Sequence, residues 1–161
     1  MIRDLVKSDA NILHHEIRPC GVNVDRHFIA KTLIENMHHY KGVGLSANQI
    51  GMDVRAFAMI RDIEHNEVIV CFNPVILDSS GDFNLCEEGC LSYPDKFINV
   101  RRPDKIYVMY EDEEGKEHKI KLEGFPSRVF QHEYDHLEGI DFTQRQYCLL
   151  YTSDAADEVD G

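Results

Sequence analysis

The sequence lacks a long apolar run, and its first residues do not predict a leader for export. No stretch approaches the roughly 20 apolar residues with which a helix crosses a bilayer. Residues 1–6 do not begin the basic and then apolar pattern of a signal peptide. We therefore expect a cytoplasmic protein without a membrane partner.

Positive charge is also scarce. Lys and Arg number 17 against 29 Asp and Glu, which gives a formal net charge of −12. A broad nucleic-acid surface needs clustered Lys and Arg to meet phosphates, so no direct nucleic-acid site is expected. The densest acidic run, residues 111–114, is typical of a solvated hairpin tip rather than of a binding patch.

A disulfide framework is absent as well. The five cysteines, at positions 20, 71, 86, 90 and 148, are odd in number and follow no small-domain pairing pattern. In a reducing compartment such cysteines are buried core residues or free thiols, unless one of them binds a metal or takes part in catalysis.

What is present fits one α+β domain. Its 161 residues, 43% apolar and 29% charged, can bury a core. Asp25 is placed to cap a helix over residues 26–40, and Gly124 and Pro126 open a second helix. Strand patterns lie between them, at 54–60, 68–72, 75–77, 106–110 and 118–122. We expect antiparallel strands packed around a central metal-binding helix, within a catalytic domain of residues 1–147.

Residues 148–161 show no capping or packing pattern linked to what precedes them. This tail resembles the translation of a sequencing-library adapter, and the alternative is a disordered acidic tail. The natural chain is then either a short form, as in some phage-encoded proteins, or one truncated at this point.

The second helix carries the pattern H-E-x-x-H at residues 132–136. In a helix, Val129, His132, Glu133 and His136 share one face, so two imidazoles can hold a divalent metal. Glu133, which is not a ligand, can move protons for a water at the metal. Alone, the pattern also fits a zinc endopeptidase, and in a chain this rich in His and Glu it has odds of roughly one in twenty of arising by chance.

Two further stretches offer complementary groups. Cys90, in the run 87–94, can be the third protein ligand that leaves one position open to water, although a buried structural cysteine is the plain alternative. The small residues of 42–49 allow a substrate backbone to approach, and Gln49 offers a carboxamide N–H. Taken alone, such a stretch is more often an ordinary segment that ends a helix.

Together the three stretches, GVGLSANQ, EGCLS and QHEYDHL, resemble the signature motifs of the peptide deformylase family in order and spacing. The resemblance runs from about residue 13 to residue 143. Members of this family remove the N-terminal formyl group from nascent polypeptides that begin with formyl-methionine. They use one divalent metal per chain, natively iron(II), often replaced by zinc or nickel.

The resemblance implies a role for each matching residue. Cys90, His132 and His136 would bind the metal, and Glu133 would be general base and then general acid. Gln49 and the N–H of Leu91 would bind the oxyanion, and Gly44 would pair with the substrate backbone. The residues expected around these are a methionine pocket of Val43, Phe125 and Val129, His N–H acceptors Glu88 and Asp135, and Arg102 as a partner of these acids.

Two departures from the family stand out. Ser46 and Asn48 replace residues common in relatives, but neither change removes the Gln49 amide. A C-terminal helix associated with ribosome docking in many bacterial members is not recognisable, so contact with the ribosome exit region is the weaker expectation. An inactive metal-binding homologue is a further alternative, although no expected catalytic residue is missing.

Overall fold

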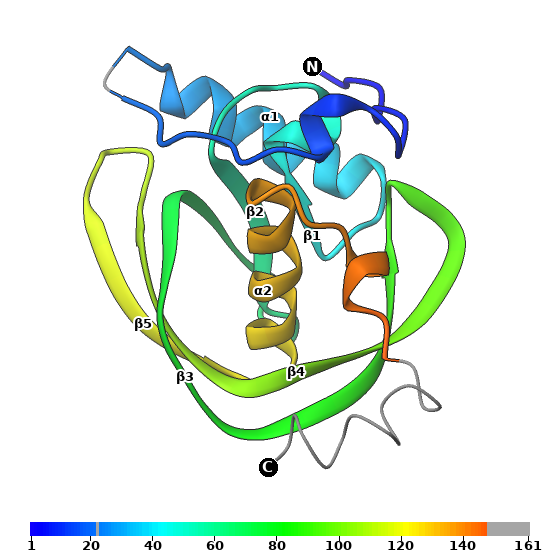
Figure 1. Ribbon diagram of the computed structural model, residues 1–161. Helices are drawn as coiled ribbons and strands as arrows, with labels where there is room; N and C mark the ends of the chain where they lie inside the picture. Colours follow the sequence, from blue (N-terminus) through cyan, green and yellow to red (C-terminus); the bar gives the residue numbers. More distant parts are fainter. Residues whose placement is uncertain (22, 148–161) are drawn as a thin grey trace.

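The computed structural model describes residues 1–21 and 23–147. A five-stranded antiparallel sheet wraps around a central helix, α2 (Phe125–Leu137), and a second helix, α1 (Arg26–His39), packs nearby (Figure 1). This confirms the expected α+β class with strands around the helix that carries H-E-x-x-H. The strands follow one another in sheet order as β1 (Gly44–Ser46), β2 (Ala56–Asp62), β3 (Glu67–Cys90), β4 (Tyr93–Glu111) and β5 (Glu117–Glu123). Three short 3₁₀ helices complete the described chain: η1 (Asn11–Leu13), η2 (Ala47–Ile50) and η3 (Phe142–Arg145).

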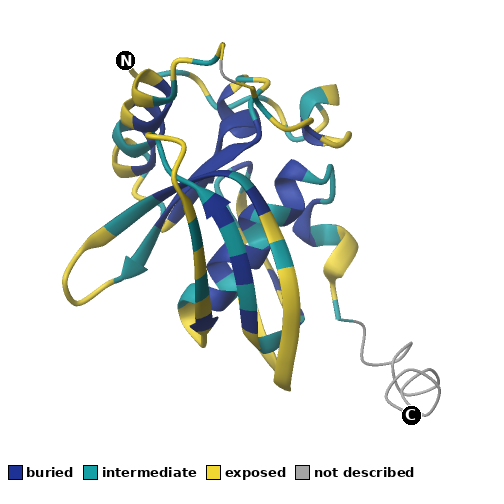
Figure 2. Ribbon diagram, turned by 90° about the vertical axis from the view of Figure 1, so that its left-hand side faces the viewer, coloured by how far each residue is buried: buried dark blue, intermediate teal, exposed yellow. Residues whose placement is uncertain are grey.

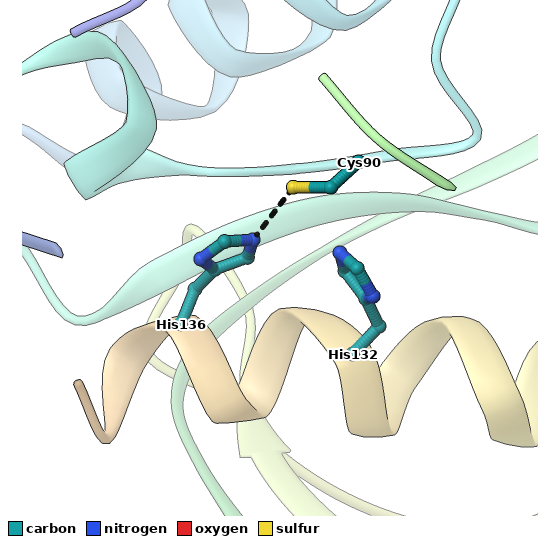
Figure 3. Close-up of side chains that lie close together, drawn as sticks. All are labelled: Cys90, His132 and His136. Atoms are coloured by element: carbon teal, nitrogen blue, oxygen red, sulfur yellow. Dashed lines mark hydrogen bonds between the residues drawn. The ribbon is translucent and has the colours of Figure 1, made fainter. Parts of the chain in front are cut away.

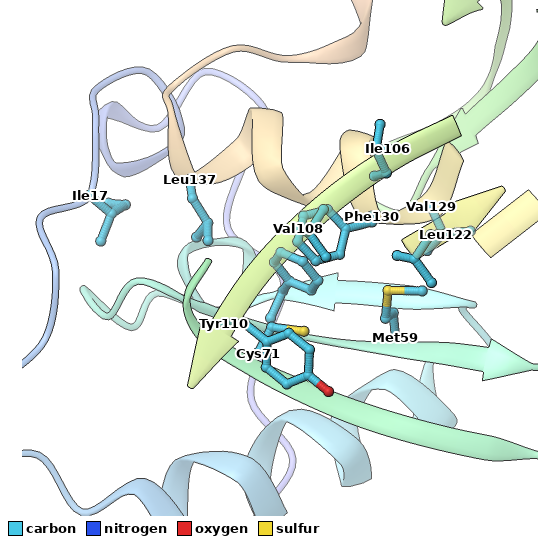
Figure 4. Packing of buried hydrophobic residues seen from close by; sticks show 11 residues of the cluster. Ile17, Met59, Cys71, Ile106, Val108, Tyr110, Leu122, Val129, Phe130 and Leu137 are labelled. Atoms are coloured by element: carbon cyan, nitrogen blue, oxygen red, sulfur yellow. The ribbon is translucent and has the colours of Figure 1, made fainter. Parts of the chain in front are cut away.

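Strand β2 separates two apolar cores because its side chains alternate between its faces. Phe57 and Met59 pack with Val129 and Phe130 of α2 (Figure 4). Ala56 and Ala58, with the opposite parity, join the cluster built on α1. The two helices are thus anchored to opposite faces of one strand, and buried residues gather where α2 meets the sheet (Figure 2).

Strands β3 and β4 form a long curved ribbon that the sequence patterns only partly indicate. The segments expected at 68–72 and 75–77 belong to one strand. Asn73 takes a positive φ of 50° and the register shifts there, but pairing with β4 continues on both sides of the shift. The ribbon runs on to the pair Cys90↔Tyr93, well beyond the expected strands. Four register shifts bend it, as extra residues in one strand generally do.

The two helices begin as their sequences indicate. The side chain of Asp25 accepts a hydrogen bond from the Phe28 N–H at 3.1 Å, and α1 follows. Gly124 precedes α2 with φ of 70°, and proline stands in the first turn of the helix. Burial of Ile29, Leu33 and Met37 holds α1 on the sheet.

The four cysteines in the described residues are free. Cys71 is buried in the core, and burial raises its pKa well above the usual value. Cys86 is exposed, whereas Cys20 and Cys90 are partly buried. Among the described helices none is both long and apolar enough to cross a membrane. The interpretation of residues 148–161 concerns a segment outside the described residues.

Candidate metal centre

Three side chains converge between α2 and the end of β3. His132 and His136 project from consecutive turns of α2 toward Cys90, the last residue of β3 (Figure 3). The Sγ atom of Cys90 lies 3.3 Å from Nε2 of His136, and the ligand atoms of all three residues lie within 4.8 Å of one another. A thiolate and two imidazoles so placed form a donor set suited to a divalent transition metal.

The orientation of His132 is set by Glu88. Nδ1 of His132 lies 3.1 Å from Oε1 of Glu88, which leaves Nε2 for the centre. Arg102 donates two hydrogen bonds to the Glu88 carboxylate, at 2.7 and 3.0 Å, from a buried position. Burial raises the pKa of Glu88, but the bonds from His132 and Arg102 outweigh it and bring the pKa to about 2. Glu88 is therefore a fixed anion behind the ring, the arrangement that commonly fixes the tautomer of a metal-binding histidine.

The local electrostatics favour a cation between these side chains. Burial lowers the pKa of His132, yet contacts with Cys90 and Glu88 outweigh it and raise the pKa to about 10. Burial lowers the pKa of His136 well below its usual value, so its ring is neutral. The groups that attract a proton to His132 also attract a metal ion, and a neutral imidazole is the form that binds one.

Oε1 of Glu133, beside the metal-ligand candidates, is a buried polar atom with no hydrogen-bond partner among the described residues, as are Nδ1 of His136 and Oδ1 of Asn48. A buried polar atom without a partner costs about 1–3 kcal/mol, so such atoms are concentrated where a ligand or a reaction uses them. Burial raises the pKa of Glu133 to about 7, which suits a group that both takes and releases protons near neutral pH.

The side-chain amide of Gln49 is held by Ser46 so that its N–H group faces Cys90. Its Oε1 accepts from the N–H and hydroxyl of Ser46, at 2.9 and 3.0 Å. Nε2 therefore points outward, 2.9 Å from Oγ of Ser92 and 3.7 Å from Sγ of Cys90. Sequence reasoning missed the roles of both serines, although the S-x-x-Q spacing of Ser46 and Gln49 is a recognisable capping box.

A pocket of about 430 Å³ opens beside these groups. Val43, Phe125 and Val129, expected as a methionine pocket, all line it. The same pocket is lined by further expected site residues: Gly44, Gln49, Glu88, Cys90, Leu91, His132 and Glu133. Residues expected from three separate stretches of the sequence therefore line one cavity.

Asp135 does not take the expected place. In the described chain its carboxylate accepts from Arg102 at 2.9 Å and from Arg145 at 3.1 and 3.0 Å, and no His N–H reaches it. The expected contact of Arg102 with the acids is present, because it bridges Glu88 and Asp135.

Comparison with known proteins places this geometry in a family. The model of the polypeptide deformylase family matches residues 2–148. The chain belongs to that family.

Individual deformylases agree with the family match. Over 108 residues the chain is 45% identical to a peptide deformylase of Thermotoga neapolitana, a match covering 67% of this chain and 64% of that protein. The crystal structure of the Thermotoga maritima deformylase superposes with a TM-score of 0.85 at 34% identity, covering 92% of this chain and 99% of that one. The Thermus thermophilus deformylase gives 0.86 at 34% identity, covering 98% and 95%.

Proposed function

We propose that this chain is a peptide deformylase, a metallohydrolase that removes the N-terminal formyl group from formyl-methionyl polypeptides and releases formate. The observation that carries the proposal is the meeting of Cys90, His132 and His136 with Glu133 and the Gln49 amide at one pocket. Membership of the deformylase family supports it.

Cys90, His132 and His136 would hold one divalent ion, iron(II) natively, with zinc or nickel able to replace it. Such an ion, when bound, supplies a Lewis acid that activates water and polarises a carbonyl. The orphaned atom on Glu133 and the anion behind His132 fit its presence.

The chain's own groups supply the proton transfers and the oxyanion site. Glu133 takes a proton from the attacking water and delivers it to the leaving amine, which its pKa of about 7 permits at neutral pH. Nε2 of Gln49 and the N–H of Leu91 donate to the oxyanion that forms at the formyl oxygen when the carbonyl carbon becomes tetrahedral, each donor being worth about 3 kcal/mol in acyl-transfer sites.

The pocket supports a methionyl substrate. Val43, Phe125 and Val129 offer apolar surface for an unbranched thioether side chain. Gly44 lies in β1, an outer strand of the sheet, where it can pair with a peptide backbone. A solved deformylase of Acinetobacter baumannii, with a TM-score of 0.83 and 30% identity, is bound to Met-Ala-Ser. We infer that this chain acts on the same class of peptide, and that it encounters such peptides in the cytoplasm near the ribosome exit.

Formate release from formyl-Met-Ala-Ser by the nickel- or iron-loaded protein tests the proposal. Glu133→Gln should reduce turnover by at least about a hundredfold, the contribution of a general base, with metal content unchanged. Glu87→Gln, at an exposed neighbouring acid, is the matched control and should behave as the unaltered protein.

Other outcomes select the alternatives. Cleavage of an unformylated internal peptide would identify an endopeptidase, and bound metal without either activity would identify a metal-binding homologue. Cys90→Ala should lose most of its metal, and full metal content in that variant contradicts the ligand assignment.

A further inference from the structure

The short helix η3 packs beside the metal centre, against Tyr93 and His132. The buried ring of Phe142 lies 5.7 Å from the His132 ring, centroid to centroid, and 5.5 Å from that of Tyr93. Asp141, which caps η3, accepts the Tyr93 hydroxyl at 2.7 Å. Because Tyr93 pairs with Cys90 in the ribbon, η3 contacts the supports of both the thiol and an imidazole.

Arg145, at the end of η3, adds a third and more specific contact. Its Nε and Nη2 donate to the two oxygens of Asp135, at 3.1 and 3.0 Å. Asp135 also accepts from Arg102, whose other N–H groups hold Glu88, and Glu88 orients His132. An unbroken series of charged hydrogen bonds therefore leads from η3 to a metal-ligand ring.

We propose that Arg145 is a positioning residue for the metal centre, acting through Asp135, Arg102 and Glu88 on the orientation of His132. The proposal rests on the metal centre proposed above. It does not require Arg145 to contact substrate or metal.

The geometry shows why loss of Arg145 would be felt at His132. Asp135 is 6% exposed, and Arg145 provides its only hydrogen bond to Oδ1 within the described chain. Loss of Arg145 removes two of the three hydrogen bonds to this buried carboxylate and leaves its charge poorly compensated, so we expect it to draw its remaining partner closer. That partner is Arg102, so the two-pronged bond to Glu88 is the contact that loosens.

Arg145 can be substituted without disturbing the packing of the core. Its side chain is 46% exposed, so substitution leaves no buried cavity. Lysine keeps the positive charge but cannot form the planar two-point bond, whereas glutamine removes the charge. Arg61, whose side chain is 37% exposed and lies 3.8 Å from Glu67, offers a matched arginine outside the lining of the pocket.

The experiment titrates the full chain, freed of metal, with Co²⁺ alone. The thiolate-to-cobalt absorption band reports the geometry at Cys90, and competition with a chelator gives the Kd. Arg145→Gln should weaken Co²⁺ binding about tenfold, the lower end of the range for groups behind metal ligands, and should shift the band. Arg145→Lys should fall between this variant and the unaltered protein, and Arg61→Gln should equal the latter.

Unchanged Co²⁺ affinity in Arg145→Gln overturns the proposal. A fall in its thermal midpoint without a change in Kd does so too, because that pattern marks a purely structural role. If the glutamine variant does not fold, equality of Arg145→Lys and the unaltered protein is the contrary result. An unaltered protein that binds Co²⁺ through Cys90 yet releases no formate contradicts the proposed function and leaves the role of Arg145 standing. Absence of Co²⁺ binding overturns both.

Discussion

At Gly44 the backbone of β1 passes so close to α2 that a single added methyl group has no room. A Cβ built there would lie 2.7 Å from Oε2 of Glu133 and 3.0 Å from Cγ1 of Val129. Such distances are below ordinary van der Waals contact, so the side chain of Glu133 or the strand has to move. Gly44 is therefore constrained by the proposed general base as well as by its expected pairing with substrate.

We predict that Gly44→Ala lowers the turnover of formyl-Met-Ala-Ser at least tenfold, because Glu133 is displaced from the proton it transfers. The strain should also lower the free energy of unfolding by about 1–3 kcal/mol. Kinetics and urea denaturation measure the two effects. Gly21→Ala is the control, since a Cβ at Gly21 meets nothing within 4 Å. Normal turnover in Gly44→Ala would show that Glu133 tolerates the shift.

At the scale of elements, α1 depends on a side chain outside it. Asp25 accepts the Phe28 N–H and satisfies one of the amide groups that the first turn leaves unpaired. The buried face of α1 supplies much of the second core, so fraying at its start is transmitted to β2.

Asp25→Ala should reduce the free energy of unfolding by about 1 kcal/mol through loss of this cap. Asp25→Asn keeps an acceptor oxygen and should cost less. Urea denaturation measures both, and the turnover of formyl-Met-Ala-Ser should stay unchanged because α1 lies outside the pocket lining. An alanine variant as stable as the asparagine variant would mean that the cap contributes nothing.

The sequence indicated both helices, because each combines a start signal with a buried face. It did not indicate the outer half of the β3–β4 ribbon. Phe83 and Leu85 there are about half exposed and Gly81 takes a positive φ, so the stretch lacks the alternation of buried and exposed residues that marks an ordinary strand. Pairing with β4, which follows after Leu91 and Ser92, makes it a strand.

The residues of the site likewise fall into those that the sequence indicated and those that it did not. Residues within the three motifs were recognisable, since spacing and chemistry act together in them. Arg145 and Phe142 lie beyond the last motif, and Arg128, which donates to Glu88, resembles any helix-surface arginine. Their contacts depend on how η3 and β3 fold against α2, which local pattern does not encode. Asp135 was assigned to the wrong partner for the same reason.

For the whole molecule, carboxylates with several donors govern stability in acid. Burial raises the pKa of Asp141, but bonds from Thr143 and Tyr93 outweigh it and hold the pKa below its usual 3.8. Bonds from His118 and from backbone N–H groups of the β4–β5 turn similarly outweigh burial at Asp112. A carboxyl whose folded pKa is depressed stabilises the fold above its unfolded pKa, and this stabilisation disappears as the pH falls through the folded value.

The thermal midpoint should therefore fall as the pH drops below about 4. Asp141→Asn should be less stable than the unaltered protein at pH 7, and the difference should close in acid, where both carry a neutral side chain. Thermal denaturation between pH 7 and pH 2.5 tests this. A difference that stays constant across the range would mean that ionisation of Asp141 is not linked to folding.

The strands lie in the sheet in the order in which they are synthesised. Each strand can pair with the one made just before it, so the sheet can grow as the chain emerges. The helix α2 comes after all five strands, and its last turn is tied to early segments through the bond from Ile17 N–H to the Leu137 carbonyl. A partly made chain can therefore form its sheet before His132 and His136 are available to Cys90, and the proposed metal site is completed only after α2 has been made.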